Sequence, residues 1–311
     1  TAPQVVSGYL DTGLSTSLGL EALNKIVSID RDITDAAEID PFASVNVQSG
    51  GAKELSIAGA NNRFNSLTID GIALNDRFGL NANGYPTQRS PISFDAIESL
   101  QIETAPMDTE FNGFTGGTIN AVTKSGTNEF HGSAYYFFTN DNFSGDTIGG
   151  TREGDILRPQ DFEEETYGFT IGGPILKDKL FFFAAYDFYE EAAPINTLPG
   201  DPGIGISDAD LQSITSIASS VYGLNTGDFS KSPVEDEKIL ASIDWNITNQ
   251  HRAKFTYIKT EGAAIQEQNG NNFVESSRVA YNSSWYNRSE TIEAFIGHVF
   301  SEWTPNFSTE F

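Results

Sequence analysis

The sequence predicts a mainly β fold in which a small α+β plug domain precedes the first strands of a transmembrane antiparallel β-barrel. Three observations support this prediction. Short elements separated by glycine, asparagine and aspartate occupy residues 1–125, long alternating strands rich in aromatic residues occupy 126–311, and the connections between those strands are short and long in turn. We therefore expect the plug at 1–125 and about six to seven barrel strands at 126–311.

Composition limits the classes of protein that remain. The 43 acidic and 18 basic residues give a net charge of -25, which argues against a nucleic-acid partner held by a basic surface. The sequence has no cysteine, which excludes disulfides, thiol catalysis and cysteine-ligated zinc within it. Its longest apolar run, Leu180–Tyr186, is far shorter than the roughly 20 residues of a membrane helix. A membrane span must then be built from strands.

The elements of the first half are short. Apolar residues recur at helical spacing behind Ser17, so we expect a helix over Ser17–Ile26 with Ser17 as its N-cap. Asp70-Gly71 is typical of a hairpin turn. Runs of β-favouring residues closed by Gly, Asn or Asp-Gly predict short strands at Ala43–Gln48, Glu54–Ala58 and Ser66–Ile69, and alternation predicts a strand at Thr118–Lys124. Between them, Phe94–Thr104 is expected to be ordered, with Ile97, Leu100 and Ile102 facing inward.

The stretch 111–138 is the junction between the two halves. The pair Gly116 and Gly117 allows close backbone approach just before the strand Thr118–Lys124. We expect a turn at Ser125–Asn128, on which the first barrel strand opens directly.

The second half consists of longer strands with one apolar and one polar face. In the second of them Tyr167, Phe169 and Ile171 alternate with small residues. The expected strands are Gly132–Phe138, Thr166–Ile175, Leu180–Glu190, Lys238–Ile247, Arg252–Thr260 and Ser289–Ser301, followed by the start of a seventh after Pro305.

Connection lengths favour a barrel over a β-sandwich. The turns after the second, fourth and sixth strands are about four residues long, whereas 139–165, 191–237 and 261–288 connect the others. Short turns at one end and long loops at the other are typical of transmembrane barrels, and a sandwich gives no reason for that segregation. A barrel with a plugged lumen needs about 22 strands, so we expect the remaining strands to follow Phe311.

Two stretches carry a resemblance to a known family. The segments Ser56–Asp76 (SIAGANNRFNSLTIDGIALND) and Asp95–Ser133, which includes KSGTNEFHG, resemble the plug domain and barrel start of TonB-dependent outer-membrane receptors, most of all the Oar-like branch. The resemblance implies a plug inside a barrel of 22 strands in the bacterial outer membrane. It also implies that an energised inner-membrane complex, the TonB complex, pulls on a segment upstream of Thr1.

The sequence departs from the family at two positions. Many members carry an arginine before the glycine of the first motif and another before the Gly-Pro of the second, where this chain has Ala58 and Thr104. In those relatives the arginines are thought to pair with barrel carboxylates and lock the plug. Neither Ala58 nor Thr104 can form such an ion pair, so a lock of that kind is not expected here.

The long loop Asn75–Ser90 supplies the candidate site. The resemblance implies that this loop faces the outer vestibule, where polar and aromatic side chains can contact a substrate; a loop this long in a compact domain is usually functional or mobile. The alternative is that these side chains only hold the loop in place. The candidates are Asn75, Asp76, Arg77, Tyr85 and Arg89.

Nothing in the sequence predicts an enzyme or a metal site. His131, His251 and His298 lack ligand spacing, and no nucleophile-elbow motif is present. No cofactor is expected, although abundant hard oxygen ligands leave calcium in the outer loops as an alternative. A helix capped by Ser207 is expected over Ser207–Tyr222, packing on its own loop.

The preferred function is energised import of an unknown extracellular substrate through a plugged barrel surrounded by outer-membrane lipid. The first alternative is an outer-membrane adhesin or protein-export component of the Oar-like type, in which the plug is structural. The second is a soluble, acidic, β-rich binding protein.

Overall fold

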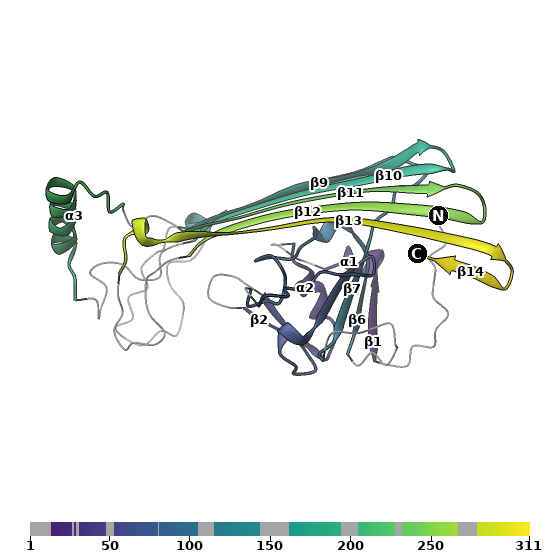
Figure 1. The fold of residues 1–311 in the computed structure, drawn as a ribbon, viewed down its shortest axis with the longest axis horizontal. Helices are drawn as coiled ribbons and strands as arrows, with labels where there is room; N and C mark the ends of the chain where they lie inside the picture. The colour runs from purple at the N-terminus through teal and green to yellow at the C-terminus, as the bar shows by residue number, and fades with distance from the viewer. Residues whose placement is uncertain are drawn as a thin grey trace.

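The computed structural model describes residues 14–26, 28, 31–47, 53–79, 81–104, 115–143, 162–193, 205–227, 232–266 and 279–311. Figure 1 shows two units: a long curved sheet, and a smaller unit of short elements that lies against one face of it. The smaller unit comes from the first half of the chain and the curved sheet from the second. The predicted succession of an α+β plug and an antiparallel sheet is confirmed.

The plug is built on a five-stranded sheet in the order β1-β6-β7-β4-β5. Strands β4 and β7 run parallel and the other neighbours antiparallel, while β2 and β3 form a separate hairpin. The strands are β1 (Ser15–Gly19), β2 (Ala43–Val47), β3 (Lys53–Ile57), β4 (Ser66–Ile69), β5 (Ile72–Ala73), β6 (Ile97–Glu103) and β7 (Thr118–Thr123). The helical elements are α1 (Leu20–Leu23), α2 (Ile33–Ala37) and the 3-10 turns η1 (Asn62–Phe64) and η2 (Phe94–Ala96).

The helix predicted at Ser17–Ile26 is only partly right. Ser17 lies in strand β1, where it is opposite Gln101 of β6, and the helix begins at Leu20 after the N-cap Gly19. Strand pairing with β6 overrides the local helical spacing. The predicted hairpin turn is confirmed, because Asp70 and Gly71 both have positive φ and join the paired strands β4 and β5.

The plug core is apolar and well filled. Each of its central side chains is at most 1% exposed, and burying one such side chain stabilises a fold by about 1.5–3 kcal/mol. These residues are Leu67, Ile69, Leu100, Ile102 and Ile119. Because they alternate along β4, β6 and β7 with half-buried polar residues, one face of the plug sheet provides this core.

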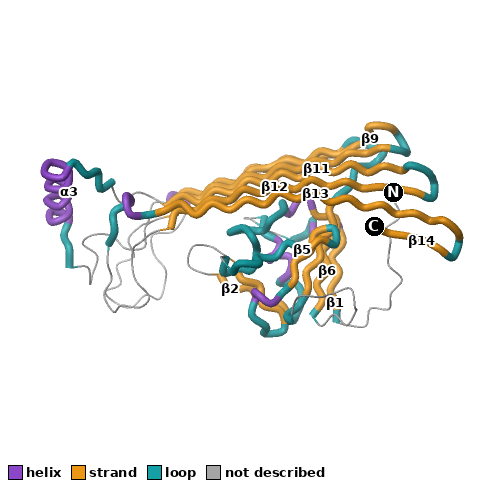
Figure 2. Tube along the Cα trace, viewed as in Figure 1, coloured by secondary structure: helices purple, strands orange, loops and turns teal. Residues whose placement is uncertain are grey.

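The curved sheet has seven strands in simple sequence order, and every neighbouring pair is antiparallel (Figure 2). Its strands are β8 (His131–Asn140), β9 (Glu163–Leu176), β10 (Leu180–Ala193), β11 (Ser232–Asn246), β12 (His251–Gln266), β13 (Tyr286–Thr304) and β14 (Phe307–Glu310). All six predicted full strands and the start of a seventh are present, and most are longer than predicted. The up-and-down order is that of a barrel wall.

The two faces of the sheet differ as the sequence predicts. Tyr167, Phe169 and Ile171 of β9 lie on the outward face, and Phe169 and Ile171 remain about half exposed. The inward face carries small and polar residues such as Thr166 and Thr170, which are buried. An outward apolar face is what lipid requires. Among the helices that the structure describes, none is long and apolar enough to cross a membrane.

The predicted turn at Ser125–Asn128 is not formed. The chain instead runs irregularly between β7 and β8, and Gly126 crosses directly over strand β10. A Cβ atom at Gly126 would lie 2.3 Å from the carbonyl oxygen of Phe182 and 2.9 Å from that of Gly173. Only glycine fits this close approach, so the segment is shaped by contact with the sheet rather than by a local turn.

The short connections gather at one end of the sheet and the long ones at the other (Figure 1). Residues 177–179, 247–250 and 305–306 form the short turns. The long connections are 141–162, 194–231 and 267–285, which include η3 (Asp141–Phe143), α3 (Asp208–Tyr222) and η4 (Asn282–Ser284). This segregation confirms the loop pattern on which the barrel prediction depends.

Helix α3 begins as predicted and contacts its own loop, where the Thr226 hydroxyl lies 3.5 Å from the Thr215 hydroxyl. Ser207 and Asp210 form a capping box at its start. Its contacts extend beyond its own loop, because the hydroxyl of Tyr281, in the next long connection, donates to the Leu211 carbonyl at 3.1 Å and lies 3.0 Å from the Thr215 hydroxyl. Two neighbouring long connections are therefore joined.

Candidate functional site

The candidate functional site is the interface between the plug and the inward face of strands β8–β13, which we call the wall. The register along β10, β11 and β12 places three kinds of contact in succession, starting from the end with short turns. A charged contact centred on Asp70 is followed by an apolar patch and then by a buried charged cluster centred on Asp187. Each is described in turn.

The Asp70 contact joins the plug hairpin to strand β12. The Asp70 carboxylate accepts hydrogen bonds from the Thr123 backbone N–H at 2.9 Å and from the Thr123 hydroxyl at 2.7 Å. It also pairs with the Lys254 ammonium at 3.3 Å and accepts from the Thr256 hydroxyl at 3.3 Å. Lys254 in turn donates to the carbonyl and hydroxyl of Thr123. A plug carboxylate thus lies against a wall cation.

The apolar patch is a continuation of the plug core. Five wall side chains belong to the same cluster of buried apolar residues as the core of the plug: Phe183, Ala185, Leu240, Ile258 and Ile296. On the plug side the cluster includes Ile92, Phe94 and Ala96, around turn η2. The patch is small, so polar contacts make up much of the rest of the interface.

The Asp187 cluster lies further along the wall. Asp187 is opposite Lys238 in the register of β10 and β11, and the Lys238 ammonium is 3.4 Å from it and also pairs with Asp236. Tyr135 of β8 donates to the Asp187 carboxylate, and the plug hydroxyl of Ser93 lies 3.5 Å from it. The three charged side chains are at most 3% exposed. Removing one partner of such a buried pair costs about 3–5 kcal/mol.

Arg89 carries the plug's positive charge into this cluster. Its guanidinium carbon is 3.5 Å from the centre of the Tyr189 ring, which is a cation–π contact. Burial by itself lowers the pKa of Arg89, but the neighbouring Tyr189, Asp236, Asp32 and Asp187 raise it above its usual value. Arg89 is therefore held as a cation between the plug and the wall.

Two further contacts fasten the plug beside the cluster. The Thr260 hydroxyl of β12 donates to the Pro91 carbonyl at 2.6 Å. Arg31 pairs with Asp95 within the plug, and its guanidinium carbon lies 4.9 Å from the centre of the Tyr135 ring. A second plug arginine thus rests on a wall tyrosine.

Asn75, Asp76 and Arg77 occupy the start of the predicted loop. The Asn75 side chain accepts from the Leu67 N–H and donates to the Asn65 carbonyl. Asp76 accepts from three backbone N–H groups of the loop, those of Phe78, Gly79 and Asn81. Arg77 is exposed. Asn75 and Asp76 thus shape the loop, and Arg77 is accessible from outside.

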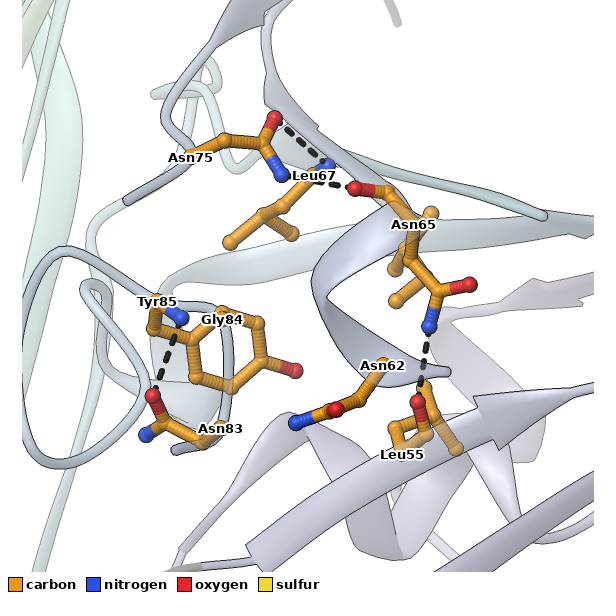
Figure 3. Close-up of a pocket in the computed structure, with 9 residues that line it drawn as sticks. Leu55, Asn62, Asn65, Leu67, Asn75, Asn83, Gly84 and Tyr85 are labelled. Atoms are coloured by element: carbon orange, nitrogen blue, oxygen red, sulfur yellow. Dashed lines mark hydrogen bonds between the residues drawn. The ribbon is translucent and has the colours of Figure 1, made fainter. Parts of the chain in front are cut away.

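Tyr85 lines a small pocket inside the plug (Figure 3). The cavity has a volume of about 10 Å³, room for about one water molecule. Its lining is rich in asparagine and consists of Leu55, Asn62, Asn65, Leu67, Asn75, Asn83, Gly84, Tyr85 and Ile119. Burial, followed by the charge of Asp32, raises the pKa of the Tyr85 phenol well above its usual value. Tyr85 is part of the plug core.

The structure does not gather the five predicted residues into one site. Tyr85 points into the plug, Arg89 points to the wall, and Arg77 is exposed. The residues that sequence reasoning missed are Ser93, Asp187, Tyr189, Asp236 and Lys238. Their signal was available, because Asp187 and Lys238 are charged residues at positions that strand alternation assigns to the inward face.

The two positions at which this chain lacks the family arginines are not among the plug–wall contacts described above. Ala58 is exposed in a turn with φ of 53°, and the backbone N–H of Thr104 bonds to the Leu14 carbonyl. Neither contributes charge to the interface. Charged plug side chains that do meet the wall include Arg31, Arg89 and Asp70.

Each of the three histidines has its own neighbours. The His131 ring is within hydrogen-bond distance of the Thr127 hydroxyl and the Glu129 carbonyl. His251 packs on Trp303, and His298 packs on Phe300. Within the described ranges, no group of three or more His, Cys, Asp or Glu side chains could hold a metal ion.

A small domain seated on the inward, polar face of an up-and-down sheet with an outward apolar face defines the class of plugged outer-membrane β-barrels. Comparison with known families agrees with this class. Residues 16–118 match the TonB-dependent Receptor Plug Domain, and residues 122–202 match an outer membrane beta barrel domain. The chain belongs to the TonB-dependent receptors of the outer membrane, a family without enzymatic activity.

Individual relatives support this assignment. The chain is 34% identical over 211 residues to the TonB-dependent transporter Oar of Myxococcus xanthus, a match that covers 62% of this chain and 19% of that protein. It is 26% identical over 195 residues to the probable TonB-dependent siderophore receptor PirA of Acinetobacter baumannii, covering 58% and 23%. The chain thus spans about a fifth of the length of these relatives.

Solved structures show the same fold. The outer membrane transporter YddB from Escherichia coli matches with a TM-score of 0.64 at 14% identity, covering 93% of this chain and 37% of that one. The siderophore receptor PirA from Acinetobacter baumannii matches with a TM-score of 0.61 at 18% identity, covering 96% and 39%.

Proposed function

We propose that the full protein imports a substrate across the outer membrane by moving the plug away from the wall, driven by the TonB complex acting at the amino end of the plug. Membership of the TonB-dependent transporter family supports energised transport in general. The substrate, and the segment that contacts the TonB complex, belong to the proposal.

One observation carries the proposal: the plug is a separate sheet that docks on the wall through side chains. No strand of the plug pairs with a strand of the wall in the described residues. Apart from one small apolar patch, the described contacts are ion pairs, cation–π contacts and side-chain hydrogen bonds, such as Thr260 to Pro91 and Ser93 to Asp187. An interface of this composition can separate and re-form without unfolding either sheet.

A reversible covalent tether between plug and wall tests the proposal. We expect the double variant Ser93→Cys and Asp187→Cys to form a disulfide, because the two side chains meet at 3.5 Å. Uptake of the natural substrate by cells that carry the full protein should stop under oxidising conditions and return after reduction. Each single-cysteine variant should show the same level of uptake under oxidising and reducing conditions, so the comparison separates the effect of the tether from the loss of Ser93 or Asp187 alone.

Full uptake with the tether closed would contradict the proposal. That outcome would favour the alternative of an outer-membrane adhesin or protein-export component with a structural plug, for which surface adhesion or export should be the same before and after reduction.

A further inference from the structure

We propose that Tyr189, Asp187 and Asp236 form a binding box on the wall for a guanidinium or ammonium group. Plug Arg89 fills this box while the plug is docked. When the plug moves away, the box takes the cationic group of a passing ligand. The last step rests on the proposed transport function. The first two concern the wall and the plug alone.

The geometry supplies the first argument. The Arg89 guanidinium carbon is 3.5 Å from the centre of the Tyr189 ring, and this tyrosine is only 5% exposed. Asp187 and Asp236 are each 1% exposed and lie on the adjacent strands β10 and β11. An aromatic face together with carboxylates, all shielded from water, is an effective environment for an organic cation.

The charge balance of the cluster supplies the second argument. Within the wall, Lys238 is the partner of both Asp187 and Asp236, so one positive charge faces two negative charges. The docked Arg89 adds a second positive charge beside these two carboxylates. When the plug withdraws, it removes this cation and leaves the wall with one negative charge in excess. A cation that replaces the guanidinium is favoured there because it restores the charge balance of the wall beside the ring of Tyr189.

A neighbouring contact repeats the arrangement. Arg31 of the plug lies over the ring of Tyr135 at 4.9 Å, and the Tyr135 hydroxyl donates to the Asp187 carboxylate. Two tyrosines on the inward face thus each receive a guanidinium from the plug beside the same aspartate. This part of the lumen is therefore suited to cationic ligands, such as basic peptides or polyamines.

Competition with a small organic cation tests the box. The full protein, with any cysteine outside residues 1–311 replaced by serine, carries the single reporter Ser93→Cys. The parent serine is buried 3.5 Å from Asp187, so the maleimide labelling rate of the cysteine reports separation of plug and wall. The probe is N-ethylguanidinium at about 10 mM, far below the molar concentrations at which guanidinium unfolds proteins. Urea at the same concentration is the neutral control.

The expected effects have opposite signs in two proteins. In the reporter protein the probe competes with Arg89, so labelling should become faster. In the Arg89→Ala version, labelling should start about tenfold faster, and the probe should slow it by filling the vacated box. Urea should change neither. Arg77→Ala, which removes an exposed arginine of the same loop, should behave like the reporter protein.

Several outcomes would overturn the box. One is that the probe leaves the labelling rate of Arg89→Ala unchanged. Another is that the probe slows labelling of the double variant Arg89→Ala, Asp236→Asn as much as it slows labelling of Arg89→Ala. If Arg89→Ala fails to fold, Arg89→Lys serves instead, because it keeps the charge and should show a smaller acceleration by the probe than the reporter protein shows. None of these measurements needs an energised cell, so they are independent of the tether experiment.

The ligand class has its own test. Cells with the full protein are offered labelled tripeptides of arginine, glutamine or glutamate, and we expect uptake to favour the arginine peptide severalfold and Asp236→Asn to abolish the preference. Absence of a preference for the arginine peptide in the wild type would overturn the cationic ligand class, whether or not the box binds N-ethylguanidinium.

Discussion

At the scale of single residues, the interface depends on charged side chains that have partners on both sides. Asp70 is the clearest case, because one carboxylate closes the plug hairpin through Thr123 and meets Lys254 on the wall. Its positive φ of 46° fits the left-handed position of a hairpin turn, which Asp and Asn tolerate. A single residue therefore couples the shape of the plug to its position on the wall.

A double-mutant cycle measures this coupling. Asp70→Asn keeps the turn but removes the Asp70 charge from beside Lys254, so we expect a loss of about 2–3 kcal/mol in the free energy of unfolding. This is below the roughly 3–5 kcal/mol of a fully buried pair, because Lys254 keeps its bonds to Thr123. In the double variant with Lys254→Met, part of that loss should be regained. Strictly additive losses in chemical denaturation would show that the pair is not coupled.

Tyr85 allows a prediction about pH. In the described part of the chain its buried hydroxyl has no hydrogen-bond partner, so Tyr85→Phe should be neutral or up to about 1 kcal/mol more stable at pH near 8. Burial raises the pKa of the folded phenol above the roughly 10 of the unfolded chain. Stability linked to this group is therefore complete below pH about 10 and lost as pH rises beyond it.

Tyr85→Phe has no phenol to ionise, so it does not lose stability in this way as pH rises. Its stability advantage over the wild type should grow between pH about 8 and pH about 11, measured by denaturation at both values. An advantage that stays constant or shrinks would mean that the phenol ionises equally well in the folded protein.

At the scale of elements, local sequence predicted strands better than helices and turns. Strand alternation is a strong signal because the lipid and the lumen impose opposite demands on successive residues, as in β9. At Ser17 and at Ser125–Asn128 the local signal failed, because pairing with β6 and passage over β10 decide the backbone there. Both failures occur where a segment contacts one distant in sequence.

The junction offers a test at this scale. Gly126→Ala would place a Cβ atom 2.3 Å from the Phe182 carbonyl oxygen, so the segment or the strand must shift, and we expect a loss of about 1–3 kcal/mol. The matched control is Gly205→Ala, whose added Cβ would have none of the described atoms within 4 Å. Thermal unfolding of the full protein in detergent should show a lowered Tm for the first variant only. Equal Tm values would mean that the junction has room to move.

At the scale of the whole molecule, plug and wall complete one another. Wall residues such as Phe183, Leu240 and Ile258 belong to the buried cluster that contains the plug core. The charges are also complementary in both directions, with plug Arg89 near wall carboxylates and plug Asp70 near wall Lys254. This alternation of sign fixes where along the wall the plug can sit.

The plug should therefore depend on the wall for its stability. We expect residues 1–125, which we propose as the plug domain, to unfold at lower denaturant concentration when expressed alone and to bind the dye ANS, since Ile92 and Phe94 would lose their wall neighbours. Hydrogen exchange compares the isolated domain with the same residues in the full protein. Equal protection of β6 and β7 in both would show that the wall adds nothing to plug stability.

The sequence by itself determined the mainly β fold, the two successive units, the positions of the strands and the family, because each of these is written in local alternation, turn residues and contiguous motifs. Only the tertiary structure decided the site. Of the five predicted residues, Arg89 reaches the wall while Tyr85 closes the plug core, and the partners of Arg89 come from residues about 100 and 150 positions further along the chain. Which inward-facing charges meet depends on strand register and on how the plug docks, and neither is encoded in any single stretch of sequence.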